Sequence, residues 1–263
     1  MTEVQITSGD NARLRLVRKL GNKRFRDEAG RFVVEGDNLV REAVSRGADV
    51  EFLLLRGGAG GAQDLALPPS VPVYGVLPEL FDRLTDAEHG IDRIAVVRKP
   101  AVTAETVASA AAGGGNILVL DRVQDPGNVG GLIRTAAAAG YCAVVCIKGT
   151  GDVYSPKVLR STAGTVYALP ILYVDSAAAA VQLAALLGKR FAVTVPCGGT
   201  RYTDVDLSRD VALVIGNEGR GVSDEILAAA DLLVTLPMRN GVESLNATVS
   251  GSILMYESIR NCK

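Results

Sequence analysis

Short apolar blocks alternate with helix-like spacing along the first hundred residues. Apolar runs predict strands at residues 32–35, 50–55, 71–74 and 94–97. Periodic spacing between these runs predicts helices at residues 37–46 and 78–84. Strands that alternate with short helices indicate a small α/β domain.

The segment Ile6–Arg26 comes before most of these blocks and has apolar residues at helical spacing, so we expect one amphipathic helix there. Its apolar stripe consists of Leu14, Leu16, Val17 and Leu20. A solvated charged face is the simplest interpretation of the other faces. However, eight Lys and Arg residues against two acids between Asn11 and Arg31 favour a surface that contacts phosphates. The candidate contacts are Arg13, Arg15, Arg18, Lys19, Lys23 and Arg24.

The composition changes after residue 100. Residues 103–112 are rich in alanine and are followed by three glycines at 113–115. Such a change is typical of a domain boundary or hinge. We therefore expect a first domain at 1–100, a linker at 101–115 and a second domain at 116–263.

The second domain shows a repeated alternation of strands and helices. The predicted strands are 116–121, 143–148, 171–174, 191–195, 211–215 and 232–236, and the predicted helices are 129–139, 156–163, 177–187, 223–229 and 244–260. Strands that are apolar throughout indicate a parallel sheet with helices on both faces. In such sheets, ligands bind at the carboxyl ends of the strands.

Composition and charge narrow the class of protein. A chain of 263 residues with 48% hydrophobic and 22% charged residues is typical of a soluble globular protein. No apolar run reaches the roughly 18 residues of a membrane span, and the N-terminus lacks the features of a secretory signal, so we expect a cytoplasmic protein with no membrane association. The four cysteines lack metal-ligand spacing, and Cys142 and Cys146 lie in an apolar run that favours buried free thiols. With His89 as the single histidine, a metal site or a Ser-His-Asp triad is not expected.

The first candidate ligand loop lies between Asp121 and Arg134. Asn128 is placed to cap the following helix. Arg134 is the only charged residue on that helix, and glycines and alanines lie one turn to either side of it, which leaves space around its head group. A surface arginine is the alternative, but the position beside a strand end favours binding. The loop matches neither the G-x-G-x-x-G dinucleotide pattern nor a P-loop, because no G-K-[ST] follows its glycines.

Two further loops follow apolar strands. The loop after residue 215 contains Gly216, Gly219 and Gly221 around Glu218, and its spaced glycines leave backbone groups free to face a ligand. In the last loop, Leu236 and Leu245 offer apolar walls, while hydrogen-bonding groups come from Ser244, Asn246 and Thr248. These groups suit a flat heterocycle such as adenine. The helix expected to open at Ser244 is rich in small residues, which allow another backbone or a ligand to approach closely.

These motifs resemble those of the SpoU–TrmH superfamily of RNA ribose 2′-O-methyltransferases. The matching stretches are DRVQDPGNVGGLIRT at 121–135, VIGNEGRGVS at 214–223 and LPMRNGVESLNATVS at 236–250. The first domain, with its stretches at 32–36 and 90–97, is similar to the family's amino-terminal substrate-binding domain, which resembles ribosomal proteins that bind structured RNA.

The resemblance implies a trefoil α/β knot, S-adenosylmethionine as methyl donor and a homodimer whose active site uses both subunits. The residues matched to cofactor contacts are Gly216, Leu236 and Leu245, and we add Asn217, Gly221 and Thr194 as candidates. Those matched to catalytic or substrate-positioning positions are Asn128, Arg134, Glu218, Ser244 and Asn246.

The sequence leaves several functions open. We expect 23S ribosomal RNA as substrate, because the first domain is similar to a module for gripping structured RNA; transfer RNA is the alternative. A non-catalytic RNA-binding or ribosome-assembly protein of the same fold is the second class, and the presence of all five matched catalytic positions argues against it. A nicotinamide or nucleotide enzyme is the third, and the loop patterns above argue against it.

Overall fold

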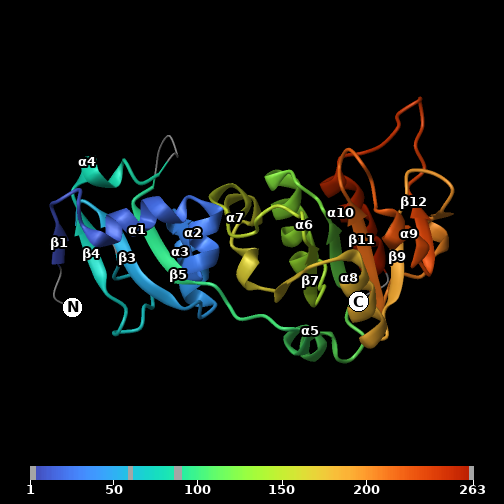
Figure 1. Cartoon of the computed structure of the whole chain (residues 1–263), viewed down its shortest axis with the longest axis horizontal. Coiled ribbons are helices and arrows are strands. Elements are labelled where there is room, and N and C mark those ends of the chain that lie inside the picture. Colours follow the sequence, from blue (N-terminus) through green and yellow to red (C-terminus); the bar gives the residue numbers. More distant parts are fainter. Residues whose placement is uncertain (1–3, 59–61, 86–90, 261–263) are drawn as a thin grey trace. The chain divides into compact units, whose positions relative to one another are not determined.

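The computed structural model describes residues 4–58, 62–85 and 91–260 (Figure 1). His89, Gly90 and Cys262 lie outside the described residues. The chain forms two compact units, one made of residues 1–101 and 154–167 and the other of residues 102–153 and 168–263.

A five-stranded sheet in the order β1-β4-β3-β5-β2 organises the first unit. Its strand β5 runs antiparallel to β2 and β3, while β1, β4 and β3 are parallel to one another. The strands are β1 (Val4–Ile6), β2 (Arg31–Glu35), β3 (Val50–Arg56), β4 (Val73–Val76) and β5 (Arg93–Arg98). The helices are α1 (Ala12–Leu20), α2 (Lys23–Ala29), α3 (Asp37–Ser45), α4 (Pro78–Phe81) and α7 (Pro156–Thr162).

The prediction of a single helix over Ile6–Arg26 is wrong. Ile6 ends a strand that pairs with β4, and the helical part is split into α1 and α2. The split occurs at Gly21 and Asn22, where the Asn22 side chain accepts a hydrogen bond from the backbone of Arg24 and so starts a new helix. The apolar stripe is confirmed in part, since its members Leu14, Val17 and Leu20 are buried.

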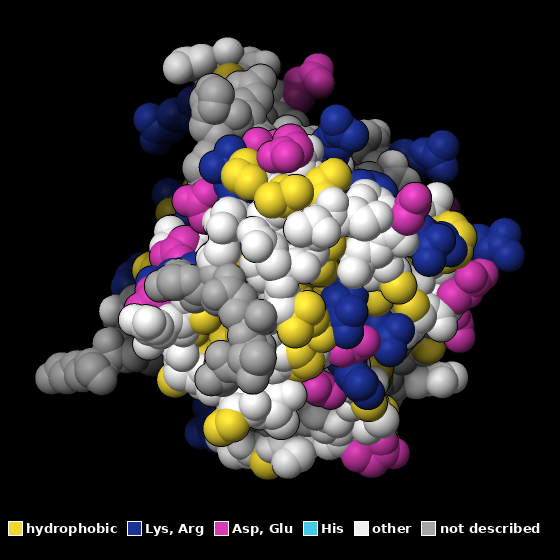
Figure 2. Space-filling model, turned by 90° about the vertical axis from the view of Figure 1, so that its left-hand side faces the viewer, with side chains coloured by type: hydrophobic (Ala, Val, Ile, Leu, Met, Phe, Trp, Pro, Cys, Tyr) yellow, Lys and Arg dark blue, Asp and Glu magenta, His cyan; other side chains and the backbone are white. Residues whose placement is uncertain are grey.

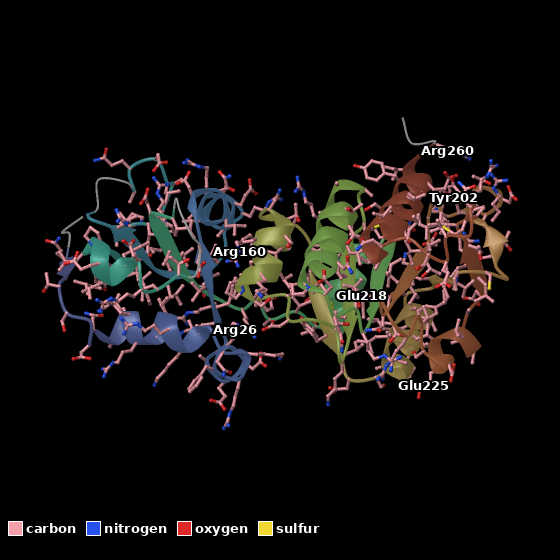
Figure 3. All side chains as sticks on the ribbon, turned by 90° about the horizontal axis from the view of Figure 1, so that it is seen from above. Arg26, Arg160, Tyr202, Glu218, Glu225 and Arg260 are labelled. Carbon is pink, nitrogen blue, oxygen red and sulfur yellow. The ribbon has the colours of Figure 1, made fainter. Side chains whose placement is uncertain are left out.

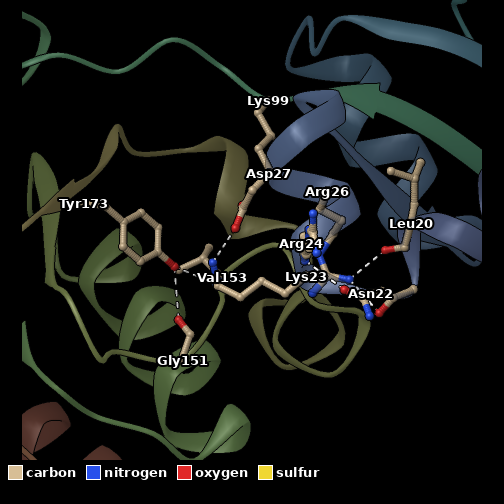
Figure 4. Close-up of polar contacts among 11 residues, drawn as sticks. Leu20, Asn22, Lys23, Arg24, Arg26, Asp27, Lys99, Gly151, Val153 and Tyr173 are labelled. Atoms are coloured by element: carbon tan, nitrogen blue, oxygen red, sulfur yellow. Dashed lines mark hydrogen bonds and ion pairs between the residues drawn. The ribbon is translucent and has the colours of Figure 1, made fainter.

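Arg26 is one of the eight basic residues expected to form an exposed charged face, but it is buried. Its residue is only 3% exposed, and one guanidinium nitrogen donates to the carbonyls of Leu20 and Gly21 at 2.6 and 2.8 Å (Figure 4). These are carbonyls at the end of α1, which have no partner within the helix. Arg26 therefore stabilises the corner between α1 and α2 rather than facing solvent.

The segment 154–167 contributes to the core of the first unit although it lies between two strands of the other. The ring of Tyr154 lies 4.7 Å from that of Phe32 on β2, and Tyr167 stacks at 6.4 Å on the same ring. Arg160, labelled in Figure 3, makes an ion pair with Glu35 at 3.4 Å. Helix α7, which lies within the range expected for the second domain, thus packs with the first unit.

A seven-stranded, fully parallel sheet in the order β10-β12-β9-β11-β6-β7-β8 organises the second unit. Its strands are β6 (Ile117–Asp121), β7 (Ala143–Ile147), β8 (Ile171–Val174), β9 (Arg190–Thr194), β10 (Thr200–Arg201), β11 (Val211–Gly216) and β12 (Leu232–Thr235). Its helices are α5 (Ala104–Ala111), α6 (Pro126–Ala138), α8 (Ala177–Leu186), α9 (Asp224–Ala228) and α10 (Ala247–Ile259).

Helices cover both faces of this sheet, which confirms the predicted α/β class. Alternate strand residues pack with α5, α8 and α9 in one apolar cluster that includes Val107, Val119, Leu183 and Ile226. On the opposite face, Ile215 lies against α10, which in turn packs against α6. The segment 104–111, expected as part of a linker, is the capped helix α5 with Val107 buried in this core. Within the described residues, no helix is both long and apolar enough to span a membrane.

Candidate active site

The loops that follow β6 and β11 start side by side. Asp121 and Gly216 are the last residues of these strands and are paired in register. The fully buried carboxylate of Asp121 accepts hydrogen bonds from the backbone and hydroxyl of Ser223 at 2.7 and 2.8 Å. The amide of Asn217 donates to the carbonyl of Arg122 at 2.8 Å. The two loops are therefore joined along their length where the strand order reverses, a usual place for a ligand.

Glu218 connects the β11 loop to the start of α6 (Figure 3). Its carboxylate accepts hydrogen bonds from the backbone N–H groups of Gln124 and Asp125, both at 3.1 Å, and from Nδ2 of Asn128 at 2.9 Å. Partial burial raises the pKa of Glu218, but the hydrogen bonds together lower it by more. The net pKa therefore lies below its ordinary value. The side chain is thus an ionised acceptor and a poor proton acceptor.

Asn128 connects the same network to α10. Its Oδ1 accepts from Nδ2 of Asn246 at 2.8 Å and from the hydroxyl of Thr248 at 3.1 Å, while its Nδ2 donates to Glu218. The prediction that Asn128 caps α6 is wrong: the cap is Asp125, whose side chain accepts from the backbone N–H of Asn128 at 2.9 Å. Asn128 is 6% exposed and lies within α6, so its side-chain amide is not used as a cap. Instead it links α6 to the β11 loop through Glu218 and to α10 through Asn246 and Thr248.

The last helix begins later than expected. Asn246, not Ser244, is its N-cap, and its Oδ1 accepts from the backbone N–H groups of Thr248 and Val249 at 2.9 and 3.3 Å. Ser244 lies in the exposed loop before the helix. Asn246 therefore caps α10 with its side-chain oxygen and donates a hydrogen bond to Asn128 with its side-chain nitrogen.

The small residues of α10 pack against α6. A Cβ on Gly251 would lie 2.4 Å from Cδ2 of Leu132, and a Cβ on Gly131 would lie 2.7 Å from Cγ2 of Thr248. The hydroxyls of Thr135 and Ser252 are 3.0 Å apart. The close approach predicted from the small residues is thus made, at least in part, within one chain.

A cavity of about 550 Å³ lies between these loops and α10. All six predicted cofactor contacts line it, together with four of the five predicted catalytic residues. These ten lining residues are Thr194, Gly216, Asn217, Gly221, Leu236, Leu245, Asn128, Glu218, Ser244 and Asn246. Its size is typical of a small-molecule site, and its walls combine apolar side chains with a few polar groups.

Arg134 is the predicted catalytic residue that does not line this cavity. It is exposed on α6, and no hydrogen bond or ion pair holds its guanidinium within residues 4–58, 62–85 and 91–260. Its positive charge is therefore available to a group from outside this chain.

The predicted basic contacts on α1 and α2 have different surroundings. The guanidinium of Arg13 lies 4.0 Å above the ring of Tyr74, and Arg18 donates to the carbonyl of Gly9 at 3.2 Å. Lys23 and Arg24 form ion pairs one turn along α2 with Asp27 and Glu28. The exposed Arg15 and Lys19 have no ion-pair partner among the described residues. On the face seen in Figure 2, Lys and Arg side chains are interspersed with Asp and Glu.

Other cavity residues and loop contacts were not predicted. Pro196, Ile215 and Met238 also line the cavity, and Asp121 and Ser223 join its two loops. All but Pro196 lie in or directly beside the motif stretches, so the motifs were the available signal. Searched over the part of the chain that the structure describes, acidic, cysteine and histidine side chains form no group able to hold a metal ion. Cys142 and Cys146 are free thiols, and burial raises the pKa of Cys146 to about 12.

Comparison with known proteins identifies this arrangement. The family model described as SpoU rRNA methylase matches residues 115–256, and that of an MRM3-like substrate binding domain matches residues 11–93. The chain belongs to the SpoU rRNA methylase family. It is therefore an RNA methyltransferase of the α/β class, with a substrate-binding domain before the methylase domain.

Relatives and solved structures agree over nearly the whole chain. The 23S rRNA (guanosine(2553)-2′-O)-methyltransferase RlmP of Bacillus subtilis is 33% identical, covering 96% of this chain and 98% of its own. The 23S rRNA (uridine(2479)-2′-O)-methyltransferase of Streptomyces viridochromogenes is 30% identical, covering 92% and 86%. An rRNA methyltransferase from Sinorhizobium meliloti, solved with bound AdoMet, superposes with a TM-score of 0.89 at 26% identity and covers 99% of both chains.

S-adenosylmethionine is the methyl donor of this family, and the cavity suits it. Leu236 and Leu245 line the cavity with apolar side chains, which suit a flat heterocycle such as adenine. Gly216 also lines the cavity. A Cβ added there would lie 2.5 Å from the backbone N of Val222, so only glycine fits and the loop backbone itself forms this part of the cavity wall. Ser244 lines the cavity and is exposed, so this part of the lining is open to solvent.

Proposed function

We propose that this enzyme transfers a methyl group to the 2′-hydroxyl of a ribose in structured RNA, with 23S ribosomal RNA as the preferred substrate. The observation that carries the proposal is the cavity lined by all three motif loops, in a chain whose relatives over nearly its full length methylate 23S rRNA. Transfer RNA is the second candidate, since other family members are named tRNA/rRNA methyltransferases.

The chemistry requires the ribose 2′-oxygen to lie in line with the methyl group of the donor and the hydroxyl to lose its proton. The bound S-adenosylmethionine would supply an electrophilic methyl group. Glu218 is already engaged by three hydrogen bonds and has a lowered pKa, so it is suited to holding loops in place and not to removing the proton. We assign Glu218, Asn128 and Asn246 as positioning residues that fix the two loops and α10 around the cavity.

Arg134 has the charge that the substrate needs. Guanidinium groups remain protonated in proteins, so we assign Arg134 to gripping an RNA phosphate and stabilising the developing alkoxide, while the proton leaves through that phosphate or a water. Because Arg134 does not line the cavity of its own chain, we propose that it serves the cavity of a second subunit.

A homodimer has a suitable surface on α10. Val249, Ile253 and Tyr256 follow one another at spacings of four and three residues and are 46%, 36% and 52% exposed. This makes an apolar stripe on the side of α10 away from Leu254 and Met255, which are buried. We also propose the trefoil knot of the family, in which α10 passes through a loop of the chain, and a cytoplasmic location.

In this proposal the two domains have different functions. The first domain grips folded RNA with exposed cations of α1, and the methylase domain holds the donor and the ribose. A non-catalytic RNA-binding protein would bind RNA equally well but would not need the intact cavity.

Mixed dimers test the proposal and the role of Arg134 together. Arg134→Ala and the cavity-blocking Leu236→Trp should each be inactive alone, since one lacks the phosphate grip and the other lacks room for adenine. If Arg134 serves the partner, mixing the two variants under subunit exchange should restore roughly a quarter of wild-type methylation, because half of the dimers would be mixed and each would carry one intact site.

No recovery in exchanged dimers would place Arg134 in its own chain's site. If Arg134→Lys and Arg134→Ala lose RNA affinity but keep turnover at saturating RNA, Arg134 is only a clamp. Wild-type protein that binds S-adenosylmethionine and RNA but transfers no methyl group would favour the non-catalytic alternative.

A further inference from the structure

Phe25 on α2 is exposed, unlike the other phenylalanines of this chain. It is 41% exposed, whereas the remaining four of the five phenylalanines are at most 4% exposed and belong to the cores. A single exposed apolar side chain is ordinary on its own. The surroundings of Phe25 set it apart.

A ridge of unneutralised cations leads to this ring. Arg15, Arg18 and Lys19 lie at spacings of three and four residues, hence on one face of α1, and all three are exposed. Arg15 and Lys19 have no acidic partner in the described ranges, and Arg18 donates only to the carbonyl of Gly9. The ammonium of Lys19 lies 5.6 Å from the centroid of the Phe25 ring. The ridge therefore ends at an aromatic ring.

The neighbouring cations differ in a way that singles out this face. Lys23 and Arg24 on α2 are paired with Asp27 and Glu28, and Arg26 is buried. Elsewhere in the first unit, Arg41, Arg56 and Arg93 also form ion pairs with aspartates. Unpaired positive charge and an exposed aromatic ring thus coincide on the α1–α2 corner.

We propose that Phe25 is a stacking platform for an unpaired RNA base, and that Arg15 and Lys19 hold the phosphates beside that base. The inference rests on the proposed RNA function and adds the kind of RNA that the first domain grips: a loop or bulge with an unstacked base, and not a continuous duplex. Aromatic rings beside cations bind single-stranded RNA in this way, because every base has a face to stack and every phosphate a charge.

A protein partner is the other class of occupant for an exposed ring. The charge argues for RNA, because three cations with no ion-pair partner among the described residues suit a phosphate backbone better than an apolar protein surface. The corner between the helices is also held rigidly by Arg26, which bonds the end of α1 from within α2. The ring and the ridge are thus fixed relative to each other before RNA binds.

A tryptophan substitution tests the stacking directly. The chain contains no tryptophan, so Phe25→Trp would carry a single tryptophan at the proposed platform, which can be excited selectively over the seven tyrosines. The probe is an RNA hairpin with a long unpaired loop, compared with a fully paired duplex of equal length. We expect the hairpin to quench the fluorescence of Phe25→Trp strongly and the duplex to quench it little. Leu186→Trp, at a site 79% exposed on α8, is the matched control and should not be quenched.

Affinity gives the second measurement. Removing a stacked aromatic side chain costs about fivefold to a hundredfold in affinity, so Phe25→Leu should bind the hairpin that much more weakly, while Phe25→Tyr should bind nearly as wild type. Far-ultraviolet circular dichroism and thermal unfolding of each variant would show that the first unit, which contains Phe25, is folded.

Three results would overturn the proposal: full-affinity hairpin binding by Phe25→Trp without quenching, wild-type affinity of Phe25→Leu, or quenching by ribosomal proteins but not by RNA. Each of these leaves the methyltransferase function intact. Failure of the wild-type enzyme to bind or methylate any RNA would instead refute the proposed function on which the inference rests.

Discussion

Asn128 and Glu218 show how single side chains organise the cavity. The amide of Asn128 donates toward the β11 loop and accepts from α10, and its orientation is set by the carboxylate on one side and by Asn246 and Thr248 on the other. Glu218 holds two backbone N–H groups at the start of α6 that have no partner within the helix. These residues act on the cavity by fixing its walls.

Replacing Glu218 by Gln should loosen these walls. The amide has only one acceptor oxygen for three donors, so we expect Glu218→Gln to lose roughly 1–2 kcal/mol of stability at neutral pH, together with affinity for S-adenosylmethionine. Denaturant unfolding and calorimetry measure the two effects. Glu225→Gln, at an exposed glutamate of α9, is the matched control and should change neither.

The same contribution has a defined pH dependence. Because the folded-state pKa of Glu218 is lowered, its stabilisation is complete above the ordinary value of 4.5 and is lost as the pH falls through the lowered value. The stability difference between wild type and Glu218→Gln should therefore shrink in acid. A difference that stays constant from neutral pH down to the acid transition would contradict the assigned role.

At this scale, the sequence predicted which residues meet but not what each one does. Nine of the ten predicted residues that line the cavity come from the motif stretches, and the tenth is Thr194 at the end of β9; residues after neighbouring parallel strands gather at one edge of the sheet. The caps were misassigned: Asp125 and Asn246 cap the helices expected to start at Asn128 and Ser244. Several adjacent polar residues can cap a helix, and only the backbone path decides among them.

At the scale of elements, α6 and α10 form one tightly packed pair. Glycines at 131 and 251 let Thr248 and Leu132 approach where any Cβ would collide. This contact brings the hydroxyl of Thr248 within reach of Asn128, so helix packing and the polar network depend on each other.

Gly131→Ala should separate the two helices. The new methyl group would meet Cγ2 of Thr248, and such overpacking typically costs about 1–3 kcal/mol, opposed by about 1 kcal/mol of gained helix propensity. Thr248→Ser removes the colliding methyl group and keeps the hydroxyl that bonds Asn128. The double variant should therefore recover stability and S-adenosylmethionine affinity relative to Gly131→Ala alone. Equal loss in the single and double variants would show that the contact with Thr248 is not the cause.

Most elements were predicted from periodicity, and the exceptions have physical reasons. A charged helix with a continuous apolar stripe was expected at Ile6–Arg26, but Gly21 and Asn22 break it and Ile6 joins a sheet. The stripe itself persists in α1, so hydrophobic spacing could not reveal the break. The two-residue strand β10 is too short to leave a periodic signal.

At the scale of the whole molecule, the parallel sheet and the boundary near residue 101 were predictable, and the assignment of residues 154–167 to the first unit was not. Apolar strands in repeated alternation indicate a parallel sheet wherever they occur. The segment 154–167 joins the first unit through Tyr154, Tyr167 and Arg160, contacts with residues more than a hundred positions away in sequence. Local patterns carry no information about such pairings.

The proposed homodimer gives a prediction at this scale. A charge in the apolar stripe of α10 should oppose association, so Ile253→Asp should be monomeric at concentrations where wild type is dimeric, with methylation reduced at least tenfold. Sedimentation equilibrium measures the oligomeric state. Leu186→Asp, at an exposed leucine on α8, should leave the dimer unchanged. A dimeric Ile253→Asp, or a monomeric wild type with full activity, would contradict the proposal.

The most direct test of the central claim is the methyl transfer itself. Purified enzyme would be incubated with isotopically labelled S-adenosylmethionine and unmodified 23S rRNA, and the RNA would be digested to nucleosides and analysed by mass spectrometry. We predict label in a single 2′-O-methylnucleoside, with none formed by the cavity-blocked Leu236→Trp. Label on a base, or no label in 23S rRNA while transfer RNA is methylated under the same conditions, would contradict the account.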